Sequence, residues 1–95
     1  GSASWHDQRG QVRLILARLL QNAGADASAE YARAESDLKA AVERGMPGSL
    51  SNLEVVYTRQ GRNDEAIAAL EELAQRVPAQ AAWAKARIEQ IRGGK

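Results

Sequence analysis

The stretch that decides the fold is Leu50–Pro78, LSNLEVVYTRQGRNDEAIAALEELAQRVP. Its apolar residues recur with a helical period on one face before Gly61 and on another face after it. The first face holds Leu50, Leu53 and Tyr57, and the second holds Ala66, Ile67, Leu70 and Leu73. Glycine accommodates a tight turn, and proline ends a helix. The stretch therefore predicts two short amphipathic helices that are joined at Gly61 and closed by Pro78.

The rest of the chain is divided by similar punctuation. Gly24 and the Gly45–Gly48 run interrupt the apolar periods on the N-terminal side, and the chain contains no Phe from which strands are often built. Helices are expected over 5–22, 28–44, 49–60, 64–77 and 80–92, with Ser28 and Asn63 as N-caps. Because the connections are short, consecutive helices should be antiparallel. The sequence thus predicts an all-α fold of about five helices arranged as antiparallel hairpins.

The periods also predict which face of each helix is buried. The expected core face of 5–22 consists of Trp5, Val12, Ile15, Leu16, Leu19, Leu20 and Ala23. Leu14 lies nearly opposite that face, beside Arg18 and Gln21, and is therefore expected to be exposed. The expected core face of 28–44 consists of Tyr31, Ala34, Leu38, Ala41 and Val42.

The spacing within Leu50–Pro78 resembles the tetratricopeptide repeat, a helical hairpin of about 34 residues with the pattern W-x2-L-G-x2-Y…A-x3-F…P. Its Trp, Leu and Tyr correspond to Leu50, Leu53 and Tyr57, and its Ala, large apolar residue and Pro correspond to Ala66, Leu70 and Pro78. Glu54 departs from the pattern, because the family has Gly or another small residue there. The resemblance implies a fragment of an α-solenoid and a role in binding rather than catalysis.

The resemblance also implies how the chain is organised. The expected divisions are 1–4, whose Gly-Ser-Ala-Ser sequence is typical of a cloning scar, a single domain over 5–92, and a flexible tail at 93–95. Within the domain, 5–46 is a degenerate repeat, 47–79 is the well-matched repeat and 80–92 is a capping helix, in which Trp83 is expected to pack. Two repeats and a cap are short for a solenoid, so the fragment either ends a longer array or dimerises.

In tetratricopeptide proteins the first helix of each repeat lines a concave groove that holds a partner peptide or helix. By resemblance, the lining residues are Ser51, Asn52, Val55, Thr58 and Arg59, together with Leu14, Arg18 and Gln21. An apolar residue such as Val55, ringed by amide, hydroxyl and guanidinium groups, can bury a partner side chain while its neighbours bond the partner backbone. The alternative interpretation is that single exposed apolar residues are ordinary surface.

Composition and charge exclude several kinds of function. The 95 residues carry 13 Lys and Arg against 12 Asp and Glu, so no overall field attracts nucleic acid or a membrane surface. There is no Cys and one His, and no nucleophile or phosphate-binding motif, so we expect no catalytic residue, metal or cofactor. The longest apolar run, Leu14–Leu20, is too short to insert across a bilayer. The sequence therefore predicts a protein that is not an enzyme.

One charged pattern offers a different site. His6, Arg9 and Arg13 recur at i, i+3 and i+7 on the first helix, and such a stripe can grip a carboxylate or phosphate. Basic ends also flank an acidic middle of the chain. The more common interpretation of both features is a solvated helix surface.

The function that the resemblance implies is non-catalytic protein–protein interaction, with a partner peptide or helix in the concave groove. In bacteria such modules serve secretion, pilus or envelope assembly and enzyme complexes, and the Ala- and Arg-rich, Lys-poor composition is typical of a bacterial source. One alternative is self-association through the first helix, which would make the chain a homo-oligomer. Another is an RNA- or anion-binding helical repeat that uses the basic ends. The sequence leaves open whether the compartment is the cytoplasm or the periplasm.

Overall fold

The computed structural model describes residues 2–93, and α-helices account for most of them. The helices are α1 (Ser2–Asn22), α2 (Ser28–Glu43), α3 (Ser49–Arg59), α4 (Asn63–Arg76) and α5 (Ala81–Gly93), with a 3₁₀ turn at Pro78–Gln80 before α5. No strand occurs among these residues, so the expected all-α class and the five helices are confirmed. The residues assigned to a cloning scar continue as the first turn of α1 from Ser2, and most of the expected tail (94–95) lies outside the described residues.

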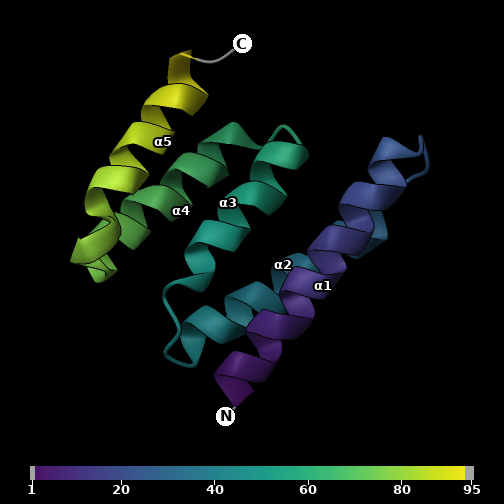
Figure 1. The fold of residues 1–95 in the computed structure, drawn as a ribbon, viewed down its shortest axis with the longest axis horizontal. Coiled ribbons are helices and arrows are strands. Elements are labelled where there is room, and N and C mark those ends of the chain that lie inside the picture. Colours follow the sequence, from purple (N-terminus) through teal and green to yellow (C-terminus); the bar gives the residue numbers. More distant parts are fainter. Residues whose placement is uncertain (1, 94–95) are drawn as a thin grey trace.

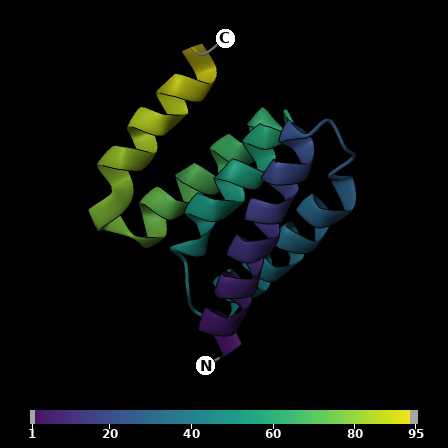
Figure 2. The same ribbon diagram turned by 45° about the vertical axis from the view of Figure 1, so that its right-hand side comes forward.

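The helices form a thin slab with principal extents of 38, 36 and 15 Å. Successive helices run in opposite directions, as expected from the short connections (Figure 1). α1 packs mainly on α2, α3 lies between α2 and α4, and α5 packs on α4 at the far edge of the slab (Figures 1 and 2). Within residues 2–93, no helix combines the length and the hydropathy that crossing a membrane requires.

The first three helices end in the same kind of turn. Gly24, Gly45 and Gly61 follow α1, α2 and α3 with φ angles of 82°, 101° and 75°. In each turn the residue after the glycine donates its backbone N–H to the carbonyl five residues earlier, as Arg62 does to Tyr57 at 2.8 Å. Only glycine adopts this left-handed conformation without strain, which is why it closes helices in this way. The predicted turn at Gly61 is therefore confirmed, and it recurs twice.

The starts of α2 and α4 differ from the expected capping. Ser28 and Asn63 are the first helical residues rather than N-caps, and neither helix has a side-chain bond from its capping position. At α2 the carboxylate of Asp26 accepts bonds from the backbone N–H and the hydroxyl of Ser28, at 2.9 and 2.7 Å. These bonds hold the pKa of Asp26 below its ordinary value. The group that stabilises the start of α2 thus lies two residues earlier than predicted.

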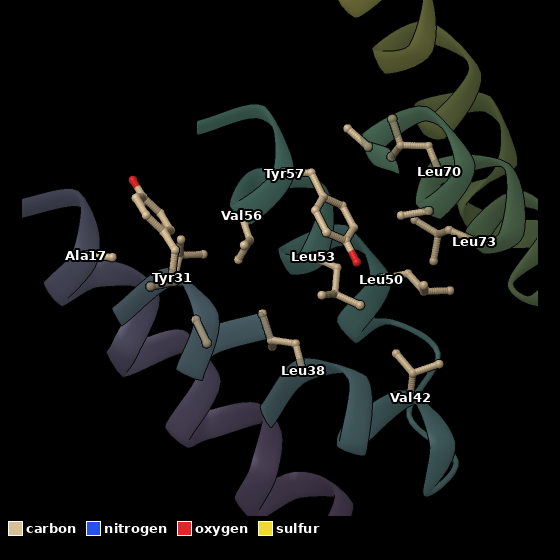
Figure 3. Packing of buried hydrophobic residues seen from close by; sticks show 14 of the residues in the cluster. Ala17, Tyr31, Leu38, Val42, Leu50, Leu53, Val56, Tyr57, Leu70 and Leu73 are labelled. Atoms are coloured by element: carbon tan, nitrogen blue, oxygen red, sulfur yellow. The ribbon is translucent and has the colours of Figure 1, made fainter. Parts of the chain in front are cut away.

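The core is centred on α2, α3 and α4. Leu38 from α2, Val56 from α3 and Leu70 and Leu73 from α4 are fully enclosed, and the rings of Tyr31 and Tyr57 pack among them (Figure 3). The predicted core faces of these three helices are confirmed except at Ile67, which is partly buried and packs against the edge of the core.

For α1 the predicted core face is wrong. Leu14, expected on the solvent side, is only 5 % exposed, and Ala17 is fully buried beside it. Of the large apolar residues expected inside, Leu20 packs partly buried against the core, and the others point outward: Trp5, Val12, Ile15, Leu16 and Leu19. The physical reason is the close approach of α1 to α2 at Gly10, where an added Cβ would lie 2.7 Å from Cγ of Leu38. The lack of a side chain at Gly10 permits this approach, and Ala17 on the same face is also small.

A buried carboxylate fixes the same side of α1 against α2. Asp37 is 4 % exposed and accepts two bonds from the guanidinium of Arg9, at 2.7 and 2.9 Å. Arg13 and His6 approach it at 3.2 and 3.5 Å. The bond from Arg9 is the main reason why the pKa of Asp37 lies below its ordinary value. The more common interpretation of the basic stripe, a solvated surface, is therefore wrong for two of its three members, because His6 and Arg13 are half-buried and the stripe grips a carboxylate of the chain itself.

A second buried ion pair joins α5 to the rest. Glu54, the residue that departs from the repeat pattern, is 2 % exposed and accepts bonds from Arg87 at 3.0 and 3.1 Å. Ala84 and Ile88 of α5 are buried, whereas Trp83 is 48 % exposed. The expectation that Trp83 packs inside the cap is wrong, because the contact of α5 with α4 is made through the smaller face.

Candidate protein-binding surface

The outer face of α1 carries the largest group of exposed apolar side chains that the structure describes. It consists of Trp5, Val12, Ile15, Leu16 and Leu19, each between 44 and 63 % exposed, and we call it the α1 stripe. At 100° per residue these positions fall within about one third of the helix circumference, opposite Leu14 and Ala17. Together they expose on the order of 500 Å² of apolar surface, which is at the upper end for a monomer.

No other helix of residues 2–93 lies over this stripe. In Figure 2 α1 runs along the outside of the molecule with α2 behind it, and α5 stands at the opposite edge. The contacts of α1 are with α2 and, to a smaller extent, with α3. Helix α1 therefore has two apolar faces, of which the folded chain uses one.

The stripe is flanked by a fixed cation at its N-terminal end. The guanidinium of Arg9 lies 4.1 Å from the ring centroid of Trp5 while it is bonded to Asp37. This stacking holds one face of the indole against the helix, so the exposed half of the ring is presented in a set orientation. Arg9 thus contacts both Asp37, which packs against α1 from α2, and Trp5 on the outer face of α1.

The residues predicted to line a groove on α3 lie together, but their hydroxyl groups are used within the chain. Ser51 donates to the carbonyl of Gly48 at 2.8 Å, and Thr58 donates within the turn of Glu54 at 3.0 Å. Asn52 and Val55 are half-buried and Arg59 is exposed. A partner that approached this face would therefore meet one amide, one guanidinium and a partly covered valine.

The predicted binding residues of α1 separate into three situations. Leu14 is buried, so the expectation that it binds a partner is wrong, for the packing reason given above. Arg18 is exposed. Gln21 accepts a bond from the hydroxyl of Tyr31 and donates to the backbone carbonyl of Arg59 at 3.0 Å. Gln21 therefore ties α1 to the end of α3, and it borders a shallow pocket of about 380 Å³ with Arg59.

A separate groove of about 470 Å³ runs between α2 and α4 above α3. Its floor is apolar, with Leu50, Leu53 and Ala69, and its rim carries both acids and bases. Near one end Arg62 donates to Glu35 at 2.9 Å and lies 4.7 Å above the ring of Tyr57. Burial opposes ionisation of Glu35, but the bonds from Arg62 and Lys39 outweigh it and hold the pKa of Glu35 below its ordinary value. This groove was not anticipated from the sequence.

The signal that identifies the α1 stripe was present in the sequence but was interpreted in the opposite sense. Gly10, Leu14 and Ala17 recur at i, i+4 and i+7, which is a second helical face made of small and medium residues. A helix with apolar residues on both sides has two surfaces to cover.

Comparison with known proteins adds no relative, since no family model, curated protein or solved structure matches the chain.

Proposed function

We propose that this protein is a non-catalytic protein–protein interaction module whose α1 stripe docks a helix of its partner. The observation that carries the proposal is the exposure of five large apolar side chains along one face of α1, in a fold whose core is otherwise complete. Apolar surface of this extent is costly to leave in water, and such patches are typical of interaction sites.

The shape and chemistry of the stripe favour a helical partner. The five residues follow the length of a helix of 21 residues, about 30 Å long, and an amphipathic partner helix presents a matching apolar seam at the same spacing. Gln11 and Arg18 border the stripe, Gln8 lies on it between Trp5 and Val12, and all three can satisfy polar groups of such a contact.

We also propose that the chain is an α-solenoid fragment of the tetratricopeptide type. The order of antiparallel hairpins, the glycine turns after α1, α2 and α3, and the position of Pro78 after α4 support this assignment. In a solenoid each helical pair is covered by its neighbours, so an exposed apolar face on a terminal helix is what such a unit presents to a further element. The predicted groove on α3, with Asn52, Val55 and Arg59, stays a prediction.

The structure favours the anion-binding alternative less than the sequence did. Arg9 and Arg13 direct their guanidinium groups at Asp37, and Arg13 lies 3.7 Å from Glu30. These cations are already neutralised inside the chain, which leaves less charge for phosphate groups. A flat dependence of any binding on salt concentration would agree with an apolar contact.

The test is a titration with a synthetic amphipathic peptide of three heptads, with Leu at the a and d positions, followed by amide chemical shifts of the labelled protein. We expect the largest shifts at α1, centred on Ile15 and Leu16. The variant Ile15→Lys should weaken binding at least tenfold, and Trp83→Lys, at an exposed aromatic residue of α5, should leave it unchanged. No shifts at millimolar peptide, or shifts centred on Ser51–Arg59, would contradict the proposal.

A further inference from the structure

Resting on the proposed function, we propose that the partner of the α1 stripe is a second copy of this chain, with the two α1 helices packed antiparallel around a two-fold axis near residues 12–15. The pairing is supported by the spacing of the stripe, its area, the other surfaces of the described chain and the sizes of the residues that would face one another.

The stripe has the spacing of a coiled-coil seam. Trp5, Val12 and Leu19 are seven residues apart, and so are Gln8, Ile15 and Asn22. These two series are offset by three residues, so they occupy the a and d positions of three successive heptads. Leu16 widens the seam on one side. The seam runs along most of α1, with the polar Gln8 and Asn22 at two of its six positions. A repeat of 3.5 residues keeps such a seam facing a second helix when the two helices wind gently around each other.

The area is sufficient for a dimer. Two stripes in contact would bury about 1,000 Å² of apolar side chain, and the bordering amides and Arg18 add polar rim, which brings the total near the 1,200 Å² of the smallest stable interfaces. A dimer of this size has modest affinity, so we expect a dissociation constant in the micromolar range.

The apolar groove between α2 and α4 has a rim of charged residues, unlike the stripe. The other large hydrophobic side chain that is more than a third exposed is Trp83, on α5. A head-to-tail contact of α1 with α5 would cover five large side chains with one and leave most of the stripe in water. A two-fold contact lets each stripe cover the other, which is also the commonest symmetry of homo-oligomers.

The sizes of the facing residues favour an antiparallel over a parallel pair of α1 helices. In an antiparallel pair centred between residues 13 and 14, the bulky Trp5 faces the small Asn22 of the second copy, Gln8 faces Leu19 and Val12 faces Ile15. A parallel pair would instead place Trp5 on Trp5 and leave Asn22 on Asn22, which overfills one end and underfills the other. Antiparallel helices also align their dipoles favourably.

The first experiment measures the mass of the protein by sedimentation equilibrium over a dilution series. We expect a concentration-dependent dimer, and at least a tenfold weaker association for Ile15→Glu and for Leu19→Glu. Trp83→Glu is the matched control at an exposed aromatic residue and should dimerise as the unchanged protein does. Because all three residues are at least 48 % exposed, circular dichroism should show that each variant keeps its helix content. A dimer that Ile15→Glu leaves intact would overturn the proposal.

The second experiment determines the relative direction of the two α1 helices by disulfide cross-linking. The chain contains no Cys, so an introduced cysteine can form a disulfide only with another introduced cysteine. Gln8→Cys and Leu19→Cys are prepared as separate proteins and oxidised alone and as a mixture. Antiparallel pairing predicts a disulfide-linked dimer only in the mixture, because residue 8 of one copy faces residue 19 of the other. In a parallel pair each protein would cross-link alone, and that result would overturn the antiparallel arrangement.

Failure of this inference can be distinguished from failure of the proposed function. A protein that stays monomeric at millimolar concentration overturns the pairing of two copies. If that monomer still binds the amphipathic peptide through α1, and Ile15→Lys weakens the binding, the proposed function stands with a different partner. If it binds no peptide, both proposals are wrong.

Discussion

The two helical hairpins bury their apolar residues in opposite ways. In the α3–α4 hairpin the large apolar residues, such as Leu53 and Leu70, are inside, and the charged residues other than Glu54 are outside. In the α1–α2 hairpin α2 also buries its large apolar residues, but α1 turns Gly10, Leu14 and Ala17 inward and most of its large apolar residues outward. The comparison teaches that the most apolar face of a helix is the buried one only when the helix has a single apolar face.

What separates the two hairpins is the kind of contact that holds them. Leucine side chains of α3 and α4 interdigitate, which needs volume on both sides. α1 approaches α2 closely at Gly10, and a buried carboxylate, Asp37, has to lie beside the cations of α1. Both requirements select the same side of α1, because His6 and Arg13, which also approach Asp37, lie beside Gly10 on it, and most of the large apolar residues are left outside.

The largest expected effect is the loss of folding stability when a leucine of the core is truncated, compared with the loss at a leucine of the stripe. Leu38→Ala should destabilise the protein by about 3 kcal/mol, because it leaves a cavity between α1, α2 and α3. Leu19→Ala, at the same residue type on the outer face, should change the free energy of unfolding of the monomer by less than about 0.5 kcal/mol. Urea unfolding at low micromolar concentration measures both. Equal losses would mean that the stripe is part of the core.

A smaller loss is expected where α5 is attached to α3. Arg87→Met should cost about 2 kcal/mol, because it leaves the buried carboxylate of Glu54 without its cation, although water reaches the partly exposed site of Arg87. Arg76→Met removes a pair of similar length to the exposed Glu72 and should cost less than about 0.5 kcal/mol. Thermal unfolding distinguishes the two variants. If both cost the same, the Glu54–Arg87 pair is not what anchors α5.

The close approach of α1 and α2 can be tested with a single methyl group. Gly10→Ala should destabilise by about 1–2 kcal/mol, since the added Cβ meets the enclosed Leu38, even though alanine favours a helix. Gly48→Ala is the control, because nothing lies within 4 Å of its added Cβ and its backbone is already α-helical. A stabilising Gly10→Ala would show that α1 lies farther from α2 than described.

The smallest effect is in the pH dependence of the ion pair between Asp37 of α2 and Arg9 of α1. The bond from Arg9 holds the pKa of Asp37 below its ordinary value of about 3.9, so the ion pair stabilises the fold above pH 4, and this stabilisation is lost as the pH falls through the lowered pKa. Asp37→Asn should therefore lower stability by about 1 kcal/mol near pH 7. The difference between the two proteins in urea unfolding should shrink as the pH is lowered below the ordinary pKa of an aspartate. A difference that does not change with pH would contradict this account.

Much of the fold was predictable because its signals are local. The glycine turns, the proline after α4 and the single apolar faces of α2, α3 and α4 each depend on residues within one or two helical turns. The predicted ends of the helices differ by a few residues at most, and the expected caps at Ser28 and Asn63 were misplaced by one. The candidate site was less predictable. Leu14 was assigned to it and is buried, whereas the stripe was assigned to the core.

The sequence by itself determined that the chain is helical, where its helices turn and how three of the five are packed, because helical period and turn chemistry act over short distances. Only the tertiary structure decided which face of α1 is inside. That choice depends on distant partners, namely the side chain of Leu38 beside Gly10 and the buried Asp37 beside Arg9, which are 28 residues apart along the chain in each case. The helical period of α1 contains no information about either partner. The stripe is exposed because α1 is oriented to make both of these contacts.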